Sequence, residues 1–187
     1  MKVVVGLGNP GPRYDDTRHN VGWWAVDRLA YDWGFGSFEK EGQSLRTGGS
    51  VGDDSVLLLK PTTYMNRSGA ALVGVHGLKE CDLGTDLLVA VDDATLDVGR
   101  VRFRPGGRTG GHKGLKSVSG VLGTESYARL RLGVGLAPEG TDLTDWVLSS
   151  MSEDDESAVV GILPELSEAV EVWMRDGIEE VMNQFNR

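Results

Sequence analysis

The fold is decided by residues 2–20, which read KVVVGLGNPGPRYDDTRHN. The first part, Lys2–Leu7, is short and rich in valine, which is typical of a buried β-strand. The glycines, prolines and polar residues that follow it predict a loop. A helix is expected next over 21–33, with Asn20 as its cap and Gly34 as its stop. A strand followed by a loop and a helix is the opening unit of an α/β fold.

The rest of the chain continues to alternate between strand and helix patterns. Further strands are expected at 55–60, 87–91, 101–104 and 130–135. Helices are expected at roughly 67–78, opened by Asn66, at about 115–122, and from Ser152 to about 182, where Pro164 should separate two helices. We therefore predict the fold class α/β, with a twisted mixed β-sheet flanked by α-helices in a single domain over residues 1–187.

Composition excludes several other classes of protein. Of the 187 residues, 40% are hydrophobic and 25% are charged, which is close to the average for globular domains. The longest apolar runs, such as 87–91, are too short to cross a membrane. A glycine-rich loop begins too early for a signal peptide, and Cys81 has no second cysteine to pair with. We expect a cytoplasmic protein with no membrane partner.

Charge is distributed unevenly along the chain. The formal net charge is −9, which by itself argues against nucleic acid as a partner. However, residues 139–187 carry a net charge of −11, whereas residues 1–138 carry +2. Within 100–116 there are four arginines and two lysines and no acidic residue. Such a run is either a solvated face or a surface that contacts phosphate groups, because guanidinium binds phosphate bidentately.

Three familiar motifs do not fit this chain. Gly6-Leu7-Gly8-Asn9-Pro10-Gly11 has the dinucleotide-binding spacing, but its prolines interrupt the helix that would have to begin there. A serine hydrolase motif Gly-x-Ser-x-Gly is absent from the sequence. The three histidines have no recognised metal-ligand spacing, so no metal site is predicted.

His19 is the strongest catalytic candidate by its position. It lies in a polar loop at the expected carboxyl edge of the first strand, where open α/β sheets place their ligands. Asn9 follows the same strand, Asn66 follows the strand 55–60, and Asp92 follows the strand 87–91. If these strands are parallel, the four side chains meet at one edge. They could then supply a base, a carboxylate that orients it, and two amides that bind carbonyl or hydroxyl groups.

Four segments together resemble the bacterial peptidyl-tRNA hydrolase family. They are Val5–Gly11 with Thr17–Asn20, Lys60–Gly69, Asp92-Asp93 with Leu96-Asp97, and Gly110–Lys116. The segments 129–135 and Met182-Asn183 fit as well, so the resemblance spans the whole chain. It implies hydrolysis of the ester that joins a peptide to the 3′-terminal ribose of tRNA, which recycles the tRNA. It also implies that the reaction uses no metal and no cofactor.

The resemblance also assigns roles to individual residues. His19 matches the general base that activates water, and Asp92 matches the acid that holds its imidazole. Asn9 matches the residue that distinguishes N-blocked from free aminoacyl ends. The remaining matches are positions that contact substrate or tRNA: Tyr14, Tyr64, Met65, Asn66, His112, Lys113, Arg102, Arg104 and Arg131. The arginines would bind the backbone of the acceptor stem without reading its sequence, and Tyr64 would stack on the terminal base. A monomer is expected.

Two departures from the family pattern keep an alternative open. Lys113 stands where the family usually has asparagine, and an ammonium can only donate hydrogen bonds. Thr95 stands where an acid is usual. We expect altered substrate affinity rather than loss of the reaction. The alternatives are a non-catalytic RNA-binding or splicing-cofactor relative of the same fold, and a small esterase that acts on other acyl substrates.

Overall fold

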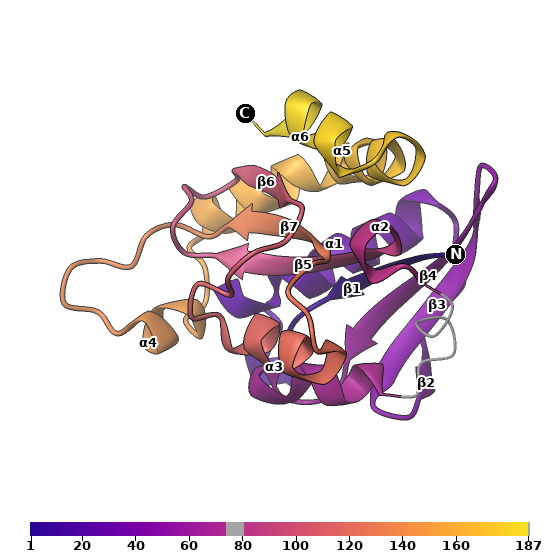
Figure 1. Cartoon of the computed structure of the whole chain (residues 1–187). Coiled ribbons are helices and arrows are strands. Elements are labelled where there is room, and N and C mark those ends of the chain that lie inside the picture. The colour runs from indigo at the N-terminus through magenta and orange to yellow at the C-terminus, as the bar shows by residue number, and fades with distance from the viewer. Residues whose placement is uncertain (74–80, 187) are drawn as a thin grey trace.

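The computed structural model describes residues 1–73 and 81–186, and its ribbon is drawn in Figure 1. Within these residues a seven-stranded sheet has the order β2-β3-β4-β1-β5-β7-β6. The strands are β1 (Lys2–Gly6), β2 (Glu39–Glu41), β3 (Ser44–Val51), β4 (Asp54–Pro61), β5 (Leu87–Asp93), β6 (Val101–Arg104) and β7 (Ala128–Gly133). The four central strands run parallel, whereas β2, β3 and β6 pair antiparallel at the edges. The predicted mixed sheet is therefore confirmed.

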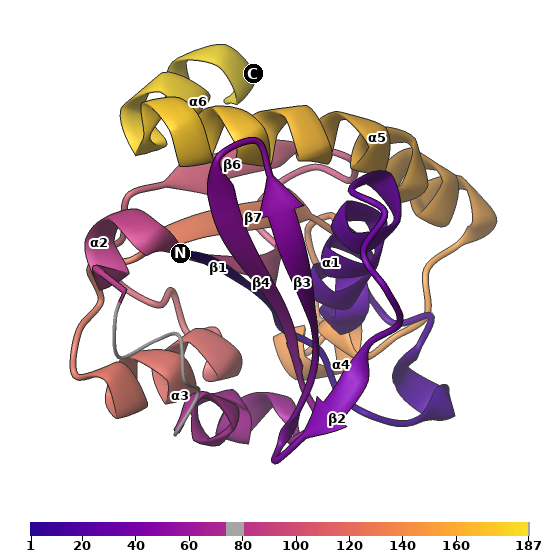
Figure 2. The ribbon, with the colours of Figure 1, turned by 90° about the vertical axis from the view of Figure 1, so that its right-hand side faces the viewer.

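Helices cover both faces of the sheet. The α-helices are α1 (Val21–Asp32), α2 (Leu83–Asp86), α3 (Lys113–Leu122), α4 (Leu143–Val147), α5 (Glu153–Asp176) and α6 (Ile178–Phe185). The 3₁₀ helices are η1 (Pro12–Tyr14), η2 (Arg18–Asn20) and η3 (Met65–Leu72). Figure 2 shows α1 and α5 on one side of the sheet and α3 on the other. No described helix is long and apolar enough to cross a membrane.

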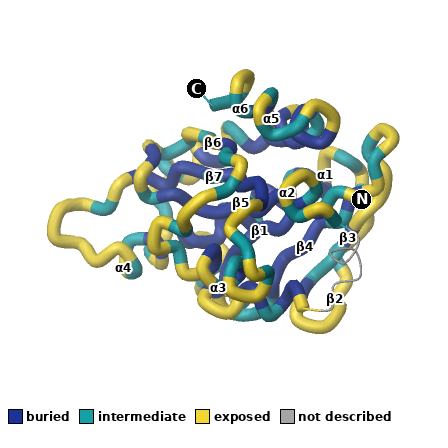
Figure 3. The backbone as a smooth tube through the Cα atoms, viewed as in Figure 1, coloured by how far each residue is buried: buried dark blue, intermediate teal, exposed yellow. Residues whose placement is uncertain are grey.

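The valine-rich first strand joins two hydrophobic cores. Successive side chains of a strand point to opposite faces, so Val4 packs with the core under α1 and α5, while Val3 and Val5 pack with the core under α3 and η3. All three are fully buried. Figure 3 shows the buried central strands in dark blue, surrounded by exposed loops and outer helix surfaces. Apolar side chains on both faces are what a strand in the middle of a covered parallel sheet requires.

The predicted break at Pro164 is wrong. α5 continues through this proline, and the break comes at Gly177, which has a φ of +89° and separates α5 from α6. A proline inside a helix removes one backbone hydrogen bond, here the bond to the carbonyl of Val160. Val160 is exposed to solvent, so water can satisfy that carbonyl, while the buried face of α5 holds the helix together.

Two predicted helix caps also differ from the structure. Asn20 stands at the cap position of α1, but its side chain makes no capping hydrogen bond and instead bonds to the backbone of Asn9. Tyr64, not Asn66, precedes the helix η3, which is 3₁₀ over Met65–Leu72. The later part of the helix expected at 67–78 lies outside the described residues.

The hairpin β2–β3 was not predicted. β3 is polar, contains two adjacent glycines and is half exposed, so it lacks the apolar pattern of a buried strand. The turn from β3 to β4 did carry a signal, because Gly52-Asp53 joins the paired residues Val51 and Asp54. A Gly-Asp pair between two extended runs is typical of a two-residue hairpin.

Candidate active site

Two neighbouring parallel strands bring the site together. β1 pairs with β5, with Gly6 opposite Ala90, so the loop after β1 and the end of β5 lie at the same edge of the sheet. The turn η2, which carries His19, packs against this edge. Gly22 permits the close approach, because a Cβ atom there would lie 2.5 Å from the carbonyl oxygens of both Leu7 and Ala90.

His19 and Asp92 form a buried pair. Nδ1 of His19 lies 2.6 Å from Oδ1 of Asp92, and the two residues are 7% and 4% exposed. A carboxylate only accepts hydrogen bonds, so it holds the ring proton of His19 on Nδ1. Nε2 of His19 has no hydrogen-bond partner among the described residues, and His19 lines a pocket of about 110 Å³. The pair thus presents the basic nitrogen of an oriented imidazole.

His112 approaches the same carboxylate oxygen. Its Nε2 lies 2.9 Å from Oδ1 of Asp92, and its Nδ1 accepts a hydrogen bond of 3.2 Å from the backbone N–H of Leu115. A backbone N–H can only donate, so Nδ1 of His112 carries no proton and Nε2 carries the proton that it donates to Asp92. His112 is therefore held in one orientation, with Nε2 directed at Asp92 and Nδ1 at the backbone N–H of Leu115.

Ionisation of Asp92 is favoured in this environment. Burial opposes it, but the attraction of His112 and His19 and the hydrogen bonds from both rings outweigh that cost. The pKa of the Asp92 carboxyl is consequently held well below its usual range. The carboxylate stays charged at any pH at which His19 could act as a base.

Asn9 is fixed by three hydrogen bonds to other segments. Its backbone N–H donates to the side chain of Asn20, whose amide donates back to the Asn9 carbonyl. Its side-chain oxygen accepts a 2.8 Å hydrogen bond from the backbone of Met65, while its Nδ2 amide has no partner among residues 1–73 and 81–186. The side chain of Met65 is buried, and its backbone N–H makes this contact with Asn9. The adjacent Asn66 is exposed, and its side chain makes no hydrogen bond within the described chain.

Two tyrosines stand together near this edge. The rings of Tyr14 and Tyr64 meet edge to face, with centroids 6.3 Å apart and planes at 78°. Arg13 lies over the Tyr14 ring and donates to its hydroxyl. Tyr64 is 54% exposed, which leaves an aromatic face available to a planar ligand.

The predicted basic residues fall into two groups. Arg102 and Arg104 lie on β6 directly opposite Arg131 and Arg129 of β7, so each pair shares one face of the sheet. Arg131 forms an ion pair with Asp93 at 3.1 Å, and buried Arg129 donates to backbone carbonyls of the neighbouring loops. Arg102 and Arg104 have no ion-pair partner within the described residues. Like charges placed opposite each other destabilise a sheet, and the ion pair of Arg131 with Asp93 offsets part of that cost.

Residues from α4 close the pocket beside His19, which sequence reasoning missed. The lining consists of His19, Asp92, Asp93, Ala94, Thr95, Gly110, Gly111, His112, Lys113, Arg131, Leu143, Thr144 and Val147. Lys113 donates a 3.3 Å hydrogen bond to the hydroxyl of Thr144 across it. Helix α4 is only five residues long and lies between glycine and serine turns, so its sequence gave little periodic signal.

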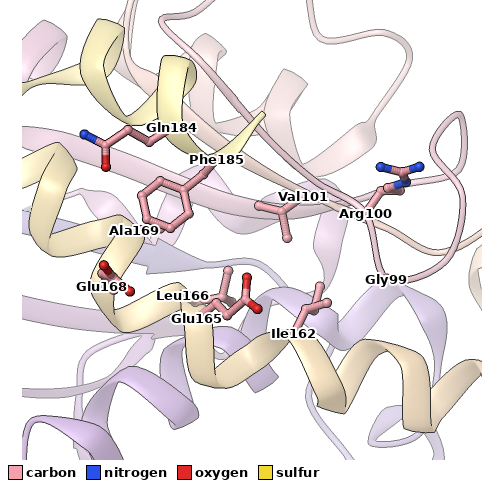
Figure 4. Close-up of a pocket in the computed structure, with 10 residues that line it drawn as sticks. All are labelled: Gly99, Arg100, Val101, Ile162, Glu165, Leu166, Glu168, Ala169, Gln184 and Phe185. Atoms are coloured by element: carbon pink, nitrogen blue, oxygen red, sulfur yellow. The ribbon is translucent and has the colours of Figure 1, made fainter. Parts of the chain in front are cut away.

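A larger hollow of about 530 Å³ lies away from the histidines, between α5, α6 and β6 (Figure 4). Apolar side chains of Val101, Leu166 and Phe185 line it, together with Glu165 and Glu168 of α5. None of its lining residues is a histidine, a cysteine or an aspartate.

The fold and the site together define an α/β protein in which a buried carboxylate orients a histidine at the carboxyl edge of the parallel strands. The family model described as Peptidyl-tRNA hydrolase matches residues 3–187. The chain belongs to the peptidyl-tRNA hydrolase family.

Individual relatives agree with this membership. A peptidyl-tRNA hydrolase of Gemmatimonas aurantiaca is 42% identical, with all of both chains covered. One of Symbiobacterium thermophilum is 43% identical over 99% of this chain and 98% of its own. The crystal structure of peptidyl-tRNA hydrolase from Acinetobacter baumannii superposes with a TM-score of 0.91 at 30% identity, covering 100% of this chain and 94% of that one. The resemblance of the four sequence segments to this family is confirmed.

Proposed function

We propose that the chain hydrolyses the ester between the peptide and the tRNA in peptidyl-tRNA, with His19 as the general base and without a metal. The observation that carries this proposal is the 2.6 Å contact between Asp92 and His19, which leaves Nε2 of His19 as a proton acceptor beside a pocket. Membership of the peptidyl-tRNA hydrolase family supplies the substrate.

The reaction needs two proton transfers. In the first, Nε2 of His19 takes a proton from a water molecule as the water oxygen bonds to the ester carbonyl carbon. In the second, the bond from this carbon to the ribose oxygen breaks, and the imidazolium returns the proton to that oxygen. The products are a free peptide carboxyl group and deacylated tRNA. Asp92 stabilises the intervening imidazolium, and such a base typically contributes about 10²–10⁴-fold to the rate.

Two amides are placed to bind the acyl group. Asn9 has an unpartnered Nδ2 and is held rigidly by Asn20 and Met65, so it is suited to bind the carbonyl of an N-blocked residue. The exposed Asn66 is our candidate for the donor to the developing oxyanion. A single well-placed donor of this kind contributes about 3–4 kcal/mol.

The geometry does not suit a resident metal. His19, Asp92 and His112 offer ligand atoms within 4.8 Å of one another. However, Nδ1 of His112 accepts from Leu115, so Nε2 bears the only ring proton. A metal at Nε2 would leave the ring with no proton at all, as an imidazolate, unless the bond to Leu115 broke. An activated ester and a positioned water do not require such a metal.

The tRNA would lie along the face of the sheet that carries Arg102, Arg104 and Arg131, which we call the basic face. Arg102 and Arg104, which lack ion-pair partners in the described chain, would contact phosphates of the acceptor stem, with Arg131 at the pocket. The exposed ring of Tyr64, steadied by Tyr14, would stack on the terminal base. His112 and Lys113 line the space between these contacts and the base. We propose a cytoplasmic monomer whose residues 1–187 form one domain.

The proposal is tested by the release of deacylated tRNA from N-acetyl-aminoacyl-tRNA, with unblocked aminoacyl-tRNA as the control. We expect turnover of the blocked substrate alone, and the same rate after dialysis against a chelator. Turnover that is lost with the chelator and restored by a divalent ion would contradict the metal-free reaction. Binding of tRNA without turnover would favour a non-catalytic RNA-binding relative of the same fold.

A further inference from the structure

One oxygen of Asp92 receives two histidine hydrogen bonds. His19 reaches Oδ1 through Nδ1 at 2.6 Å, and His112 reaches the same atom through Nε2 at 2.9 Å. The ring centroids lie 5.1 Å apart, with the planes tilted by 51°. A substrate-contacting role for His112, as the sequence suggested, would leave this second bond unexplained.

The opposite side of the His112 ring is tied to the start of α3. Its Nδ1 accepts the backbone N–H of Leu115 and so acts as the N-cap of the helix. Such an N–H would otherwise be unsatisfied in the first turn. The side chain of His112 is only 10% exposed, and both of its nitrogens are occupied. The helix therefore fixes the ring and its tautomer.

We propose that His112 is a positioning residue that, through its Nε2–H, holds the Asp92 carboxylate in the orientation that His19 requires. This inference rests on the proposed function, in which His19 is the base. In this arrangement the helix α3 orients His112, His112 orients Asp92, and Asp92 orients His19. The second hydrogen bond also spreads the negative charge of the carboxylate, which limits how strongly Asp92 holds the imidazolium form of His19.

The influence of His112 on His19 can be separated from that of the charged groups around His19. Asp92 and Asp93 come from β5, Arg131 from β7 and Lys113 from the start of α3. Asp93 is paired with Arg131, and the pocket-lining residues of α4 carry no charge. The guanidinium of Arg18, next to His19, is directed to Asp155 of α5. Replacing His112 by asparagine removes its hydrogen bond to Asp92 and leaves these other charged groups in place.

The substitution His112→Asn should remove the hydrogen bond from His112 to Asp92 and keep the one from Leu115. Asparagine is a favoured N-cap, so its side-chain oxygen can still accept from Leu115, but its shorter side chain does not reach Asp92. We expect kcat to fall by about 10- to 100-fold, as for loss of a hydrogen bond to a charged group. We also expect the acid limb of the pH profile to move to higher pH, with KM and the melting temperature little changed. His112→Ala, which loses both bonds, should in addition melt at a lower temperature.

A higher KM in His112→Asn with an unmoved acid limb would overturn the inference, because it would identify His112 as a substrate contact. A second measurement does not depend on the reaction. Nitrogen NMR of the histidine rings, without substrate, should show His112 protonated only at Nε2 over the pH range in which activity rises. A doubly protonated His112 in that range would overturn the positioning role, even if the enzyme hydrolyses peptidyl-tRNA through His19.

Discussion

Oδ1 of Asp92 and Nδ1 of His19 lie 2.6 Å apart in a pair that is almost closed to solvent. Asp92→Asn replaces the carboxylate by a carboxamide, whose NH₂ group can donate to Nδ1 and move the ring proton to Nε2. We expect single-turnover hydrolysis of N-acetyl-aminoacyl-tRNA to slow by about 10²–10⁴-fold with the fold retained. A rate within twofold of the native rate would show that the pair does not serve the reaction.

The same carboxylate couples stability to pH. The pKa of Asp92 is lowered in the folded protein, whereas an unfolded aspartate has a pKa of about 3.9. Ionised Asp92 therefore stabilises the fold above about pH 4, and this contribution is lost as the pH falls toward the folded pKa. Urea unfolding should show a steeper fall in unfolding free energy below about pH 4 for the native chain than for Asp92→Asn. Parallel curves for the two proteins would contradict this linkage.

Replacing Arg102 tests whether the basic face binds tRNA phosphates. Removing one phosphate contact should weaken binding of tRNAs of different sequence alike, and should lower the slope of log K against log salt by about one. Arg102→Ala should therefore bind deacylated tRNA more weakly and with less salt dependence. Arg175→Ala is the matched control, because it removes the same charge from α5, where Arg175 pairs with Asp176. Equal effects of the two variants would indicate that only net charge matters.

Replacing Tyr64 tests whether its ring stacks on the terminal base of the tRNA. Stacking of a base on an aromatic ring contributes about 1–3 kcal/mol, so Tyr64→Ala should raise KM by about 5- to 150-fold, whereas Tyr64→Phe should keep the native KM. Tyr31→Ala removes another exposed tyrosine, from α1, and should leave KM unchanged. If Tyr64→Phe were as impaired as Tyr64→Ala, the hydroxyl rather than the ring face would be the contact.

Lys113 departs from the family pattern and contacts α4. The hydrogen bond from Lys113 to Thr144 is long and exposed, and a net hydrogen bond contributes about 0.5–1.5 kcal/mol. Lys113→Asn should therefore change KM by no more than about tenfold while kcat stays close to the native value. A large loss of kcat in this variant, at unchanged KM, would place Lys113 in the chemical step instead.

The sequence predicted most of the elements because their signals are local. Short apolar runs of valine and leucine identified the parallel strands. Ser152 with the acids after it correctly marked the start of α5, where its side chain accepts from the backbone N–H of Asp155. The predicted helix break at Pro164 was wrong because burial of the opposite face of α5 outweighs the loss of one backbone hydrogen bond. The polar strand β3 is held by its pairing with β4, which no local pattern carries.

The candidate site was predictable only in part. Its members could be placed at one edge, because parallel strands end together. The sharing of one Asp92 oxygen by His19 and His112 depends on residues that are 20 and 73 positions from Asp92, and no spacing rule connects them. The capping bond from Leu115 to His112 was equally hidden, although a polar residue before a helix is a general signal of a cap.

The most direct test of the central claim compares the native chain with His19→Ala. Single-turnover hydrolysis of N-acetyl-aminoacyl-tRNA and binding of the same tRNA are measured on both proteins. Loss of the general base should slow hydrolysis by at least about 10²-fold while the affinity for tRNA stays within about twofold. Hydrolysis at the native rate in His19→Ala would contradict the assignment of His19 as the base.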